Sequence, residues 1–326
     1  SVPGLAKDTR LPILIDETLL VLGLRAPGGG EGIATLVNWN THPSVAGGGN
    51  SEISADFPGA LVARMEKEWG GTGLYVSGDL GGQIGSRRAK IRSEITGKVI
   101  PGSSMQLVEA LGDKLAGVAL GALDGAVSKG PEPAPRIDVQ ATSLRVPLDN
   151  PDFVQALALG VLQPRKLYPP GGDSPGWLPS ALPDPSTFEP GAYDLASEAA
   201  VVDLGSIAWA LVPGELYPEI ALGQYQTPQD PGADFQGAPQ EPGLRALAGK
   251  PLFIVCLAND ELGYIIPKSE WDSEPPYAYG RKEMQYGERV SAGPETAPLV
   301  MEAFQQMLEP GATSHAVTGS LEASGR

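Results

Sequence analysis

The amino-acid sequence predicts an α/β fold in which a mixed central sheet is flanked by helices and joined by long loops. Short apolar runs rich in β-branched and aromatic residues, which are typical of buried strands, alternate with longer stretches of helical periodicity. Glycine (43 residues) and proline (32 residues) are abundant, yet 41% of the residues are hydrophobic, which indicates ordered loops around a core. A chain of 326 residues can bury one large core, and we expect a single domain over residues 1–310 with a flexible tail over residues 311–326.

The first part of the chain is predicted to form a strand followed by a strand–helix–strand unit. The expected elements are a strand over 19–24, a turn over 28–30, a strand over 33–40, a helix from about 54 and a strand over 74–76. Leu61, Met65 and Trp69 recur at helical spacing, after a Ser54 or Asp56 that can cap the helix start. This order gathers the polar residues that follow the two strands of the unit at one edge of a sheet.

The rest of the chain alternates in the same way around two long loops. A helix over 104–127 is indicated by an apolar stripe made of Leu107, Leu111, Leu115, Val118 and Leu123. The segment 163–192 is dense in proline, glycine and serine, and a loop of this length is expected to be functional or mobile. The other expected elements are a strand over 139–146, a helix over 153–162, strands over 199–204 and 207–212, a short helix carrying Glu219, a loop over 224–243, a strand over 252–257 and a helix over 294–308.

Composition excludes several classes of partner. The formal net charge of −16 argues against nucleic acid, which is bound through clustered Lys and Arg, and against simple electrostatic adhesion to anionic membranes. No apolar run approaches the roughly 20 residues that span a membrane. Cys256 is the single cysteine and lies in an apolar run, so we expect a buried thiol and no internal disulfide.

Polar side chains follow the apolar runs at four places, and three of them could hold a metal ion. His42, Glu215 and Tyr264 each follow or end such a run, and Asp79 marks a fourth exit. An imidazole, a carboxylate and a phenol, with one further histidine, would suit zinc with an open coordination position. Each residue also has a structural explanation: a hydrogen-bonded histidine whose backbone is restricted by the proline that follows it, a first-turn glutamate favoured by the helix dipole, and a core tyrosine. We expect the three to converge in one cleft.

Five stretches resemble a known family. They are Leu36-Val-Asn-Trp-Asn-Thr-His42-Pro, Ile53-Ser-Ala-Asp56-Phe-Pro-Gly59, Gly78-Asp79, Val212-Pro-Gly-Glu215-Leu-Tyr-Pro-Glu219 and Asn259-Asp-Glu-Leu-Gly-Tyr264-Ile-Ile-Pro267. In this order they are similar to the N-terminal catalytic domain of neutral/alkaline non-lysosomal ceramidases, above all to bacterial ceramidase-like proteins, over most of the chain. In that family two histidines, a glutamate and a tyrosine hold zinc. The resemblance therefore implies that His42, Glu215 and Tyr264 are zinc ligands.

The resemblance implies a zinc-dependent hydrolase that cleaves an amide (N-acyl) bond of a small-molecule or lipid-like substrate with a metal-activated water. Asp79 is a catalytic candidate, and Tyr277 or Tyr279 would serve as an oxyanion donor, by analogy with a downstream tyrosine of ceramidases. The family carries a serine in a Gly-Asp-x-Ser pattern, whereas this chain has Gly78-Asp79-Leu-Gly81, so that serine is missing. The alternative is a non-catalytic ceramidase-like binding or structural module that has lost part of the zinc site.

The start of the chain also fits the resemblance. Ser1-Val-Pro-Gly4 resembles the tail of a family motif whose histidines supply the remaining zinc ligand, so that histidine would lie upstream of Ser1. We therefore expect an exported precursor, secreted or located in the periplasm or at the cell surface, and a cleaved N-terminal segment is a candidate partner. Simple truncation is the alternative explanation.

Overall fold

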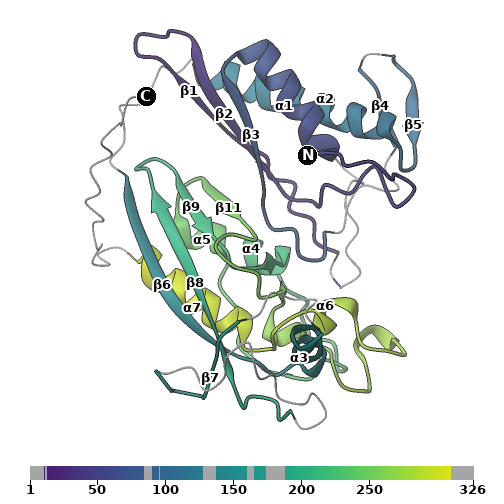
Figure 1. The fold of residues 1–326 in the computed structure, drawn as a ribbon, viewed down its shortest axis with the longest axis vertical. Helices are drawn as coiled ribbons and strands as arrows, with labels where there is room; N and C mark the ends of the chain where they lie inside the picture. The colour runs from purple at the N-terminus through teal and green to yellow at the C-terminus, as the bar shows by residue number, and fades with distance from the viewer. Residues whose placement is uncertain are drawn as a thin grey trace.

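The computed structural model describes residues 11, 13–83, 90–94, 96–127, 137–159, 165–173 and 188–309. The expected N-terminal motif, the tail over 311–326 and much of the loop over 163–192 lie outside these residues. The α/β fold is confirmed, and the described chain forms two lobes (Figure 1). The N-terminal lobe, residues 13–127, contains a three-stranded sheet, and the C-terminal lobe, residues 137–309, contains a five-stranded sheet.

The N-terminal lobe is a sheet covered by two helices. Strands β1 (Leu20–Arg25), β2 (Gly32–Trp39) and β3 (Thr72–Ser77) lie in the order β1-β2-β3, with β1 antiparallel and β3 parallel to β2. Helix α1 (Asp56–Trp69) makes the crossover and packs against α2 (Met105–Val127). Most of the predicted periodic residues form this core, because Leu61, Met65, Leu107, Leu111 and Leu115 are all fully buried. Val118 of the expected stripe is instead 47% exposed. A hairpin of β4 (Lys90–Arg92) and β5 (Val99–Pro101) precedes α2.

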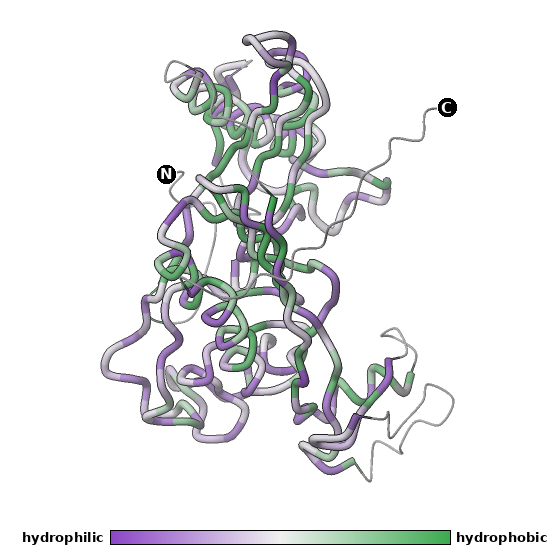
Figure 2. Tube along the Cα trace, turned by 90° about the vertical axis from the view of Figure 1, so that its left-hand side faces the viewer, coloured by the Kyte–Doolittle hydropathy of each residue, from purple (hydrophilic) through white to green (hydrophobic). Residues whose placement is uncertain are grey.

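The C-terminal lobe has the strand order β11-β9-β8-β6, and α7 (Thr296–Leu308) packs against β6 and β8. Its strands are β6 (Asp138–Pro147), β7 (Leu167–Tyr168), β8 (Asp194–Asp203), β9 (Ala208–Leu211) and β11 (Leu252–Val255). Its other helices are α3 (Pro151–Ala158), α4 (Pro218–Leu222), α5 (Leu244–Ala248) and α6 (Tyr286–Arg289). Figure 2 shows hydrophobic segments concentrated along strands and helices, while many of the outer loops are hydrophilic.

The two sheets meet where β3 and β11 end, and polar groups join them. Cys256 N donates a hydrogen bond to Ser77 O (3.2 Å). The buried Asn38 side chain donates through Nδ2 to Val76 O (3.1 Å) and to Ile254 O (2.8 Å). The predicted central sheet is thus split into two sheets, and a side-chain amide replaces the backbone ladder between them.

Several boundaries differ from the expected ones. The N-cap position of α1 is Ala55, yet the predicted Ser54 and Asp56 serve the helix start, because Asp56 N donates to Ser54 Oγ (3.0 Å) and Phe57 N donates to Asp56 Oδ1 (2.8 Å). Strand β8 begins at Asp194, ahead of the expected residue 199, and pairs with β7, inside the segment expected to be a loop. The short strands β4, β5, β10 (Glu215–Leu216) and β12 (Tyr264–Ile265) and helix α5 were not predicted, because elements of two to five residues have no measurable periodicity.

Two expectations from composition can be compared with the described residues. Cys256 is buried and carries a free thiol, as expected. In the described ranges, no helix combines the length and the apolar character needed to cross a membrane.

Candidate functional site

His42 lies at the exit of β2, at the junction of the two lobes. Thr41 Oγ1 donates a hydrogen bond to Gln83 O (3.3 Å), which ties this exit to the loop after β3. His42 Nε2 lies 2.8 Å from Glu215 Oε2, and the two side chains are 22% and 17% exposed. A side chain from the N-terminal lobe therefore meets one from the C-terminal lobe in a partly hydrated position.

Glu215 and Tyr264 stand side by side on two short parallel strands. Strand β10 (Glu215–Leu216) pairs with β12 (Tyr264–Ile265), and Glu215 is opposite Tyr264 in the register. Burial raises the pKa of Tyr264, and the charge of Glu215 and a hydrogen bond between the two side chains raise it further. The phenol is therefore protonated at neutral pH. The structure thus brings His42, Glu215 and Tyr264 together across 173 and 49 residues of sequence.

The donor set fits a zinc ion. His42 Nε2 and Glu215 Oε2 are both buried atoms that lack hydrogen-bond geometry although they lie 2.8 Å apart. Two tetrahedral ligands at about 2.0–2.1 Å from zinc would be about 3.3 Å apart, so a small widening would admit the ion. Imidazole nitrogen and carboxylate oxygen are the usual zinc ligands, and the phenol of Tyr264 is a third oxygen donor. Within the described ranges, no group of three or more His, Cys, Asp or Glu residues could hold a metal ion.

The loop before Tyr264 contains several residues with left-handed backbone conformations, which favour glycine. Leu257 (φ 56°), Asn259 (φ 68°) and Gly263 (φ 80°) are all in the left-handed region. A Cβ on Gly263 would lie 1.8 Å from Val290 O, so only glycine fits there. Because Gly263 O also accepts a hydrogen bond from Glu215 N (2.9 Å), this loop sets the distance between Glu215 and Tyr264.

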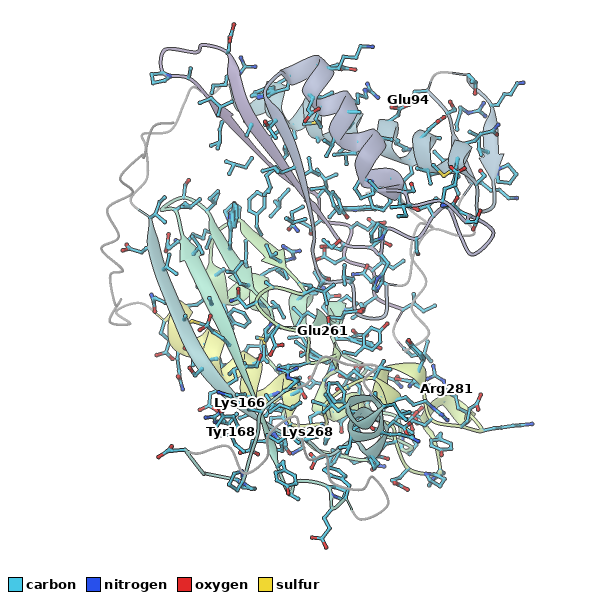
Figure 3. The ribbon with its side chains drawn as sticks, viewed as in Figure 1. Glu94, Lys166, Tyr168, Glu261, Lys268 and Arg281 are labelled. Atoms are coloured by element: carbon cyan, nitrogen blue, oxygen red, sulfur yellow. The ribbon has the colours of Figure 1, made fainter. Side chains whose placement is uncertain are left out.

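Arg165 forms a hydrogen bond and an ion pair with the loop before Tyr264. Its Nη1 donates to Glu261 O (3.0 Å), and its Nη2 donates to Ala196 O (3.1 Å) and pairs with Asp260. Loss of hydration around its carboxylate raises the pKa of Glu261 to about 7, and the charges of Glu215 and Asp260 contribute. Figure 3 places Glu261 where the two lobes meet. Neither Arg165 nor Glu261 was a sequence candidate, because nothing in the local pattern distinguishes them from surface residues.

Asp79 lies inside a buried polar network. Its side chain is 0% exposed; Arg245 Nη2 donates to Asp79 Oδ1 (3.3 Å) and Gln83 Nε2 donates to Asp79 Oδ2 (3.1 Å). Arg245 Nε also donates to Asp16 Oδ2 (2.7 Å). Burial raises the pKa of Asp79 well above its usual range, and the charge of Asp16 and a hydrogen bond with it raise it further, against the attraction of Arg245. Asp16 and Arg245 were not predicted, because their partners are 63 and 166 residues from them in sequence.

Tyr277 and Tyr279 lie in the loop before α6. Tyr277 is half-buried, and Tyr279 has a left-handed backbone (φ 58°) whose N–H donates to Asp230 Oδ2 (3.2 Å). The Arg281 guanidinium stands 5.3 Å from the centre of the Tyr279 ring. The oxyanion-donor role of these two tyrosines remains a prediction.

Tyr286 is the exposed aromatic residue beside the site. Its ring is 6.0 Å from that of Tyr264 in an edge-on contact, and 64% of the residue is exposed. It borders an open depression of about 460 Å³ lined by residues 281–286. Tyr217 contacts the Tyr264 ring as well, at 5.9 Å. The sequence placed Tyr286 in a loop but gave no signal for this contact.

Solved structures of ceramidases share this fold. The crystal structure of neutral ceramidase from Pseudomonas aeruginosa has a TM-score of 0.53 and 14% identity, over 89% of this chain and 46% of that one. A ceramidase complexed with C2 has a TM-score of 0.53 and 13% identity, over 92% and 50% of the two chains. At these identities the likeness shows a ceramidase-like fold alone, and the chain spans about half the length of these structures. No protein-family model and no curated protein matches the sequence.

Proposed function

We propose that this chain is a zinc-dependent hydrolase of the neutral ceramidase-like type that cleaves an amide bond in a small-molecule or lipid-like substrate. His42, Glu215 and Tyr264 would hold the zinc. The observation that carries the proposal is the 2.8 Å approach of His42 Nε2 to Glu215 Oε2, with Tyr264 hydrogen-bonded to the same carboxylate. The ceramidase-like fold supports it at the level of architecture.

Zinc bound at this place would lower the pKa of a water ligand to about 7 and polarise the substrate carbonyl. Burial and the charge of Glu215 keep the phenol of Tyr264 protonated at neutral pH, so a zinc ion held there would have to displace that proton, and its affinity would rise with pH. The charge of Glu215 contributes to the raised pKa of Glu261, which is about 7. A carboxyl group with this pKa is suited to exchange protons with solvent beside the proposed zinc site. The exposed ring of Tyr286 offers an apolar wall beside Tyr264.

The remaining donor would come from outside the described residues. We propose a histidine upstream of Ser1, on a segment that stays associated with the chain, as the resemblance implies. From the same resemblance we propose that the protein acts outside the cell, in the periplasm or at the cell surface.

A non-catalytic binding module is the second candidate function. Gly81 stands where the ceramidase pattern carries its serine, and Asp79 is held in a buried network by Arg245 and Gln83. A module of this kind would still bind zinc at His42 and Glu215 but would not turn over an amide.

Zinc binding and amide hydrolysis, measured separately, test both candidates. Zinc content and affinity would be determined for the wild type, for His42→Ala and for Tyr264→Phe, with His315→Ala, the other histidine of the chain, as the matched control. We expect His42→Ala to lose more than the roughly 10–100-fold in affinity that changes around a metal ligand cost. Hydrolysis of a fluorogenic N-acyl amide that depends on His42 supports the enzyme, and zinc binding without turnover supports the module. A folded wild type that binds no zinc, or His42→Ala binding as tightly as wild type, would refute the proposed site.

A further inference from the structure

The β4–β5 hairpin carries a face that differs from the rest of this acidic chain. In the register, Lys90 is opposite Pro101 and Arg92 is opposite Val99, so these four residues share one side of the ladder, and all four are exposed. Ile91, on the other side, is buried in the core of the N-terminal lobe. The fold therefore anchors the hairpin by one face and leaves the other to solvent.

The exposed side combines positive charge with apolar surface. Lys90, Arg92 and Lys98 are exposed on a hairpin of a chain with 39 acidic and 23 basic residues. The hairpin's described acidic residue, Glu94, forms an ion pair with Arg64 (2.8 Å), which also pairs with Glu68 (2.9 Å). Val99 is 48% exposed. Figure 1 shows the hairpin at the outer edge of the N-terminal lobe, and Figure 3 places Glu94 there as well.

We propose that this hairpin face, made of Lys90, Arg92, Val99 and Pro101 on the exposed side of the ladder together with the exposed Lys98 of the adjoining turn, docks the protein onto an anionic lipid surface. The cations would meet lipid phosphates and carboxylates, and Val99 with Pro101 would rest at the headgroup boundary. The net charge of −16 opposes adhesion of the whole molecule, so contact is confined to this projecting face. The inference does not depend on the zinc chemistry.

The size of the face favours a lipid surface over a protein or a nucleic acid. A stable protein interface uses about 20–30 residues on each side, whereas the hairpin face offers five. Nucleic acid would bring many more phosphates against the acidic surface around the hairpin. A planar bilayer needs only the tip of the molecule, and the resulting attachment is weak and reversible.

Vesicle co-sedimentation of the full chain tests the proposal. The probes are vesicles of phosphatidylcholine alone and vesicles of phosphatidylcholine mixed with phosphatidylserine. We expect binding to the mixed vesicles only, and weaker binding as the Debye length falls from about 30 Å at 0.01 M salt to about 8 Å at 0.15 M. Each removed cation lowers the partition coefficient about fivefold, so Lys90→Gln/Lys98→Gln is expected to lose about 25-fold.

The control has the same charge change at another place. Lys166→Gln/Lys282→Gln removes two exposed cations from the C-terminal lobe and is expected to bind mixed vesicles like the wild type. Circular dichroism and thermal melting check that both variants keep the fold. The proposal is overturned if the wild type does not sediment with mixed vesicles at low salt, or if the two double variants lose binding equally. Failure on vesicles together with retention on immobilised polyglutamate would assign the face to an acidic protein instead.

Discussion

Replacing Arg245 with methionine should destabilise the protein strongly and in a pH-dependent way. The guanidinium donates to Asp16 Oδ2 (2.7 Å), to Asp79 Oδ1 (3.3 Å) and, through Nη1, to Leu252 O (2.9 Å). Asp16 is 2% exposed and Asp79 is 0% exposed. Methionine fills part of the volume but leaves two buried carboxyl groups and one carbonyl without this partner.

The expected loss of unfolding free energy is about 3–5 kcal/mol at neutral pH, as for other buried ion pairs that lose one member. Burial raises the pKa of Asp79 in the folded protein, whereas an unfolded Asp titrates near 3.9. The proton on Asp79 therefore contributes stability that is complete below about pH 4 and is lost as the pH rises through the folded-state pKa. Arg245 lowers the pKa of Asp79, so its removal raises that pKa further. In the variant, the unfolding free energy therefore falls over a wider pH range, by up to about 1.4 kcal/mol per pH unit.

Urea unfolding followed by circular dichroism measures this effect at about pH 5.5 and pH 7.5. We expect the Arg245→Met deficit to be smaller at the lower pH, and Asp79→Asn in the same background to recover part of it at the higher pH. Arg289→Met, at an exposed arginine of α6, is the matched control and should change stability by less than about 0.5 kcal/mol. A deficit equal to that of the control, or one that is the same at both pH values, would refute the reasoning.

Three further predictions concern the parts that bring the site together. Asn38→Ala should cost about 2–4 kcal/mol in urea unfolding, because two buried carbonyl groups lose their donor; an unchanged midpoint would contradict the bridging role. Gly263→Ala should cost more than about 2 kcal/mol, whereas Gly121→Ala, at an open helical position, should gain about 0.5–1 kcal/mol; the reverse order in thermal melting would be inconsistent with this backbone. Arg165→Ala should loosen the loop before Tyr264 and lower zinc affinity roughly 10–100-fold by titration calorimetry, and equal affinity would exclude a positioning role.

The positions of most long elements could be predicted from local sequence, and so could the residues that form the core. Leu61 and Met65 recur at helical spacing and are buried in α1, because an amphipathic helix must cover a sheet with its apolar stripe. The segment 33–40 has the composition of a buried strand and forms β2. The family resemblance added the prediction that His42, Glu215 and Tyr264 are ligands of one zinc ion. Sequence spacing alone did not distinguish this role from a structural one.

How these parts meet was decided by contacts that are distant in sequence. The expected single sheet is divided, because β11 meets β3 through Asn38 and Cys256 rather than through a continuous ladder. His42 reaches Glu215 because two short strands, too short to have a pattern, place the carboxylate at the lobe junction. The same holds for Asp79: a strand exit is visible in the sequence, but Asp16 and Arg245, 63 and 166 residues away, determine its charge environment. A local sequence pattern predicts which residues are buried, because it reflects their hydrophobicity. Only the tertiary structure determines which buried polar groups form hydrogen bonds or ion pairs with one another.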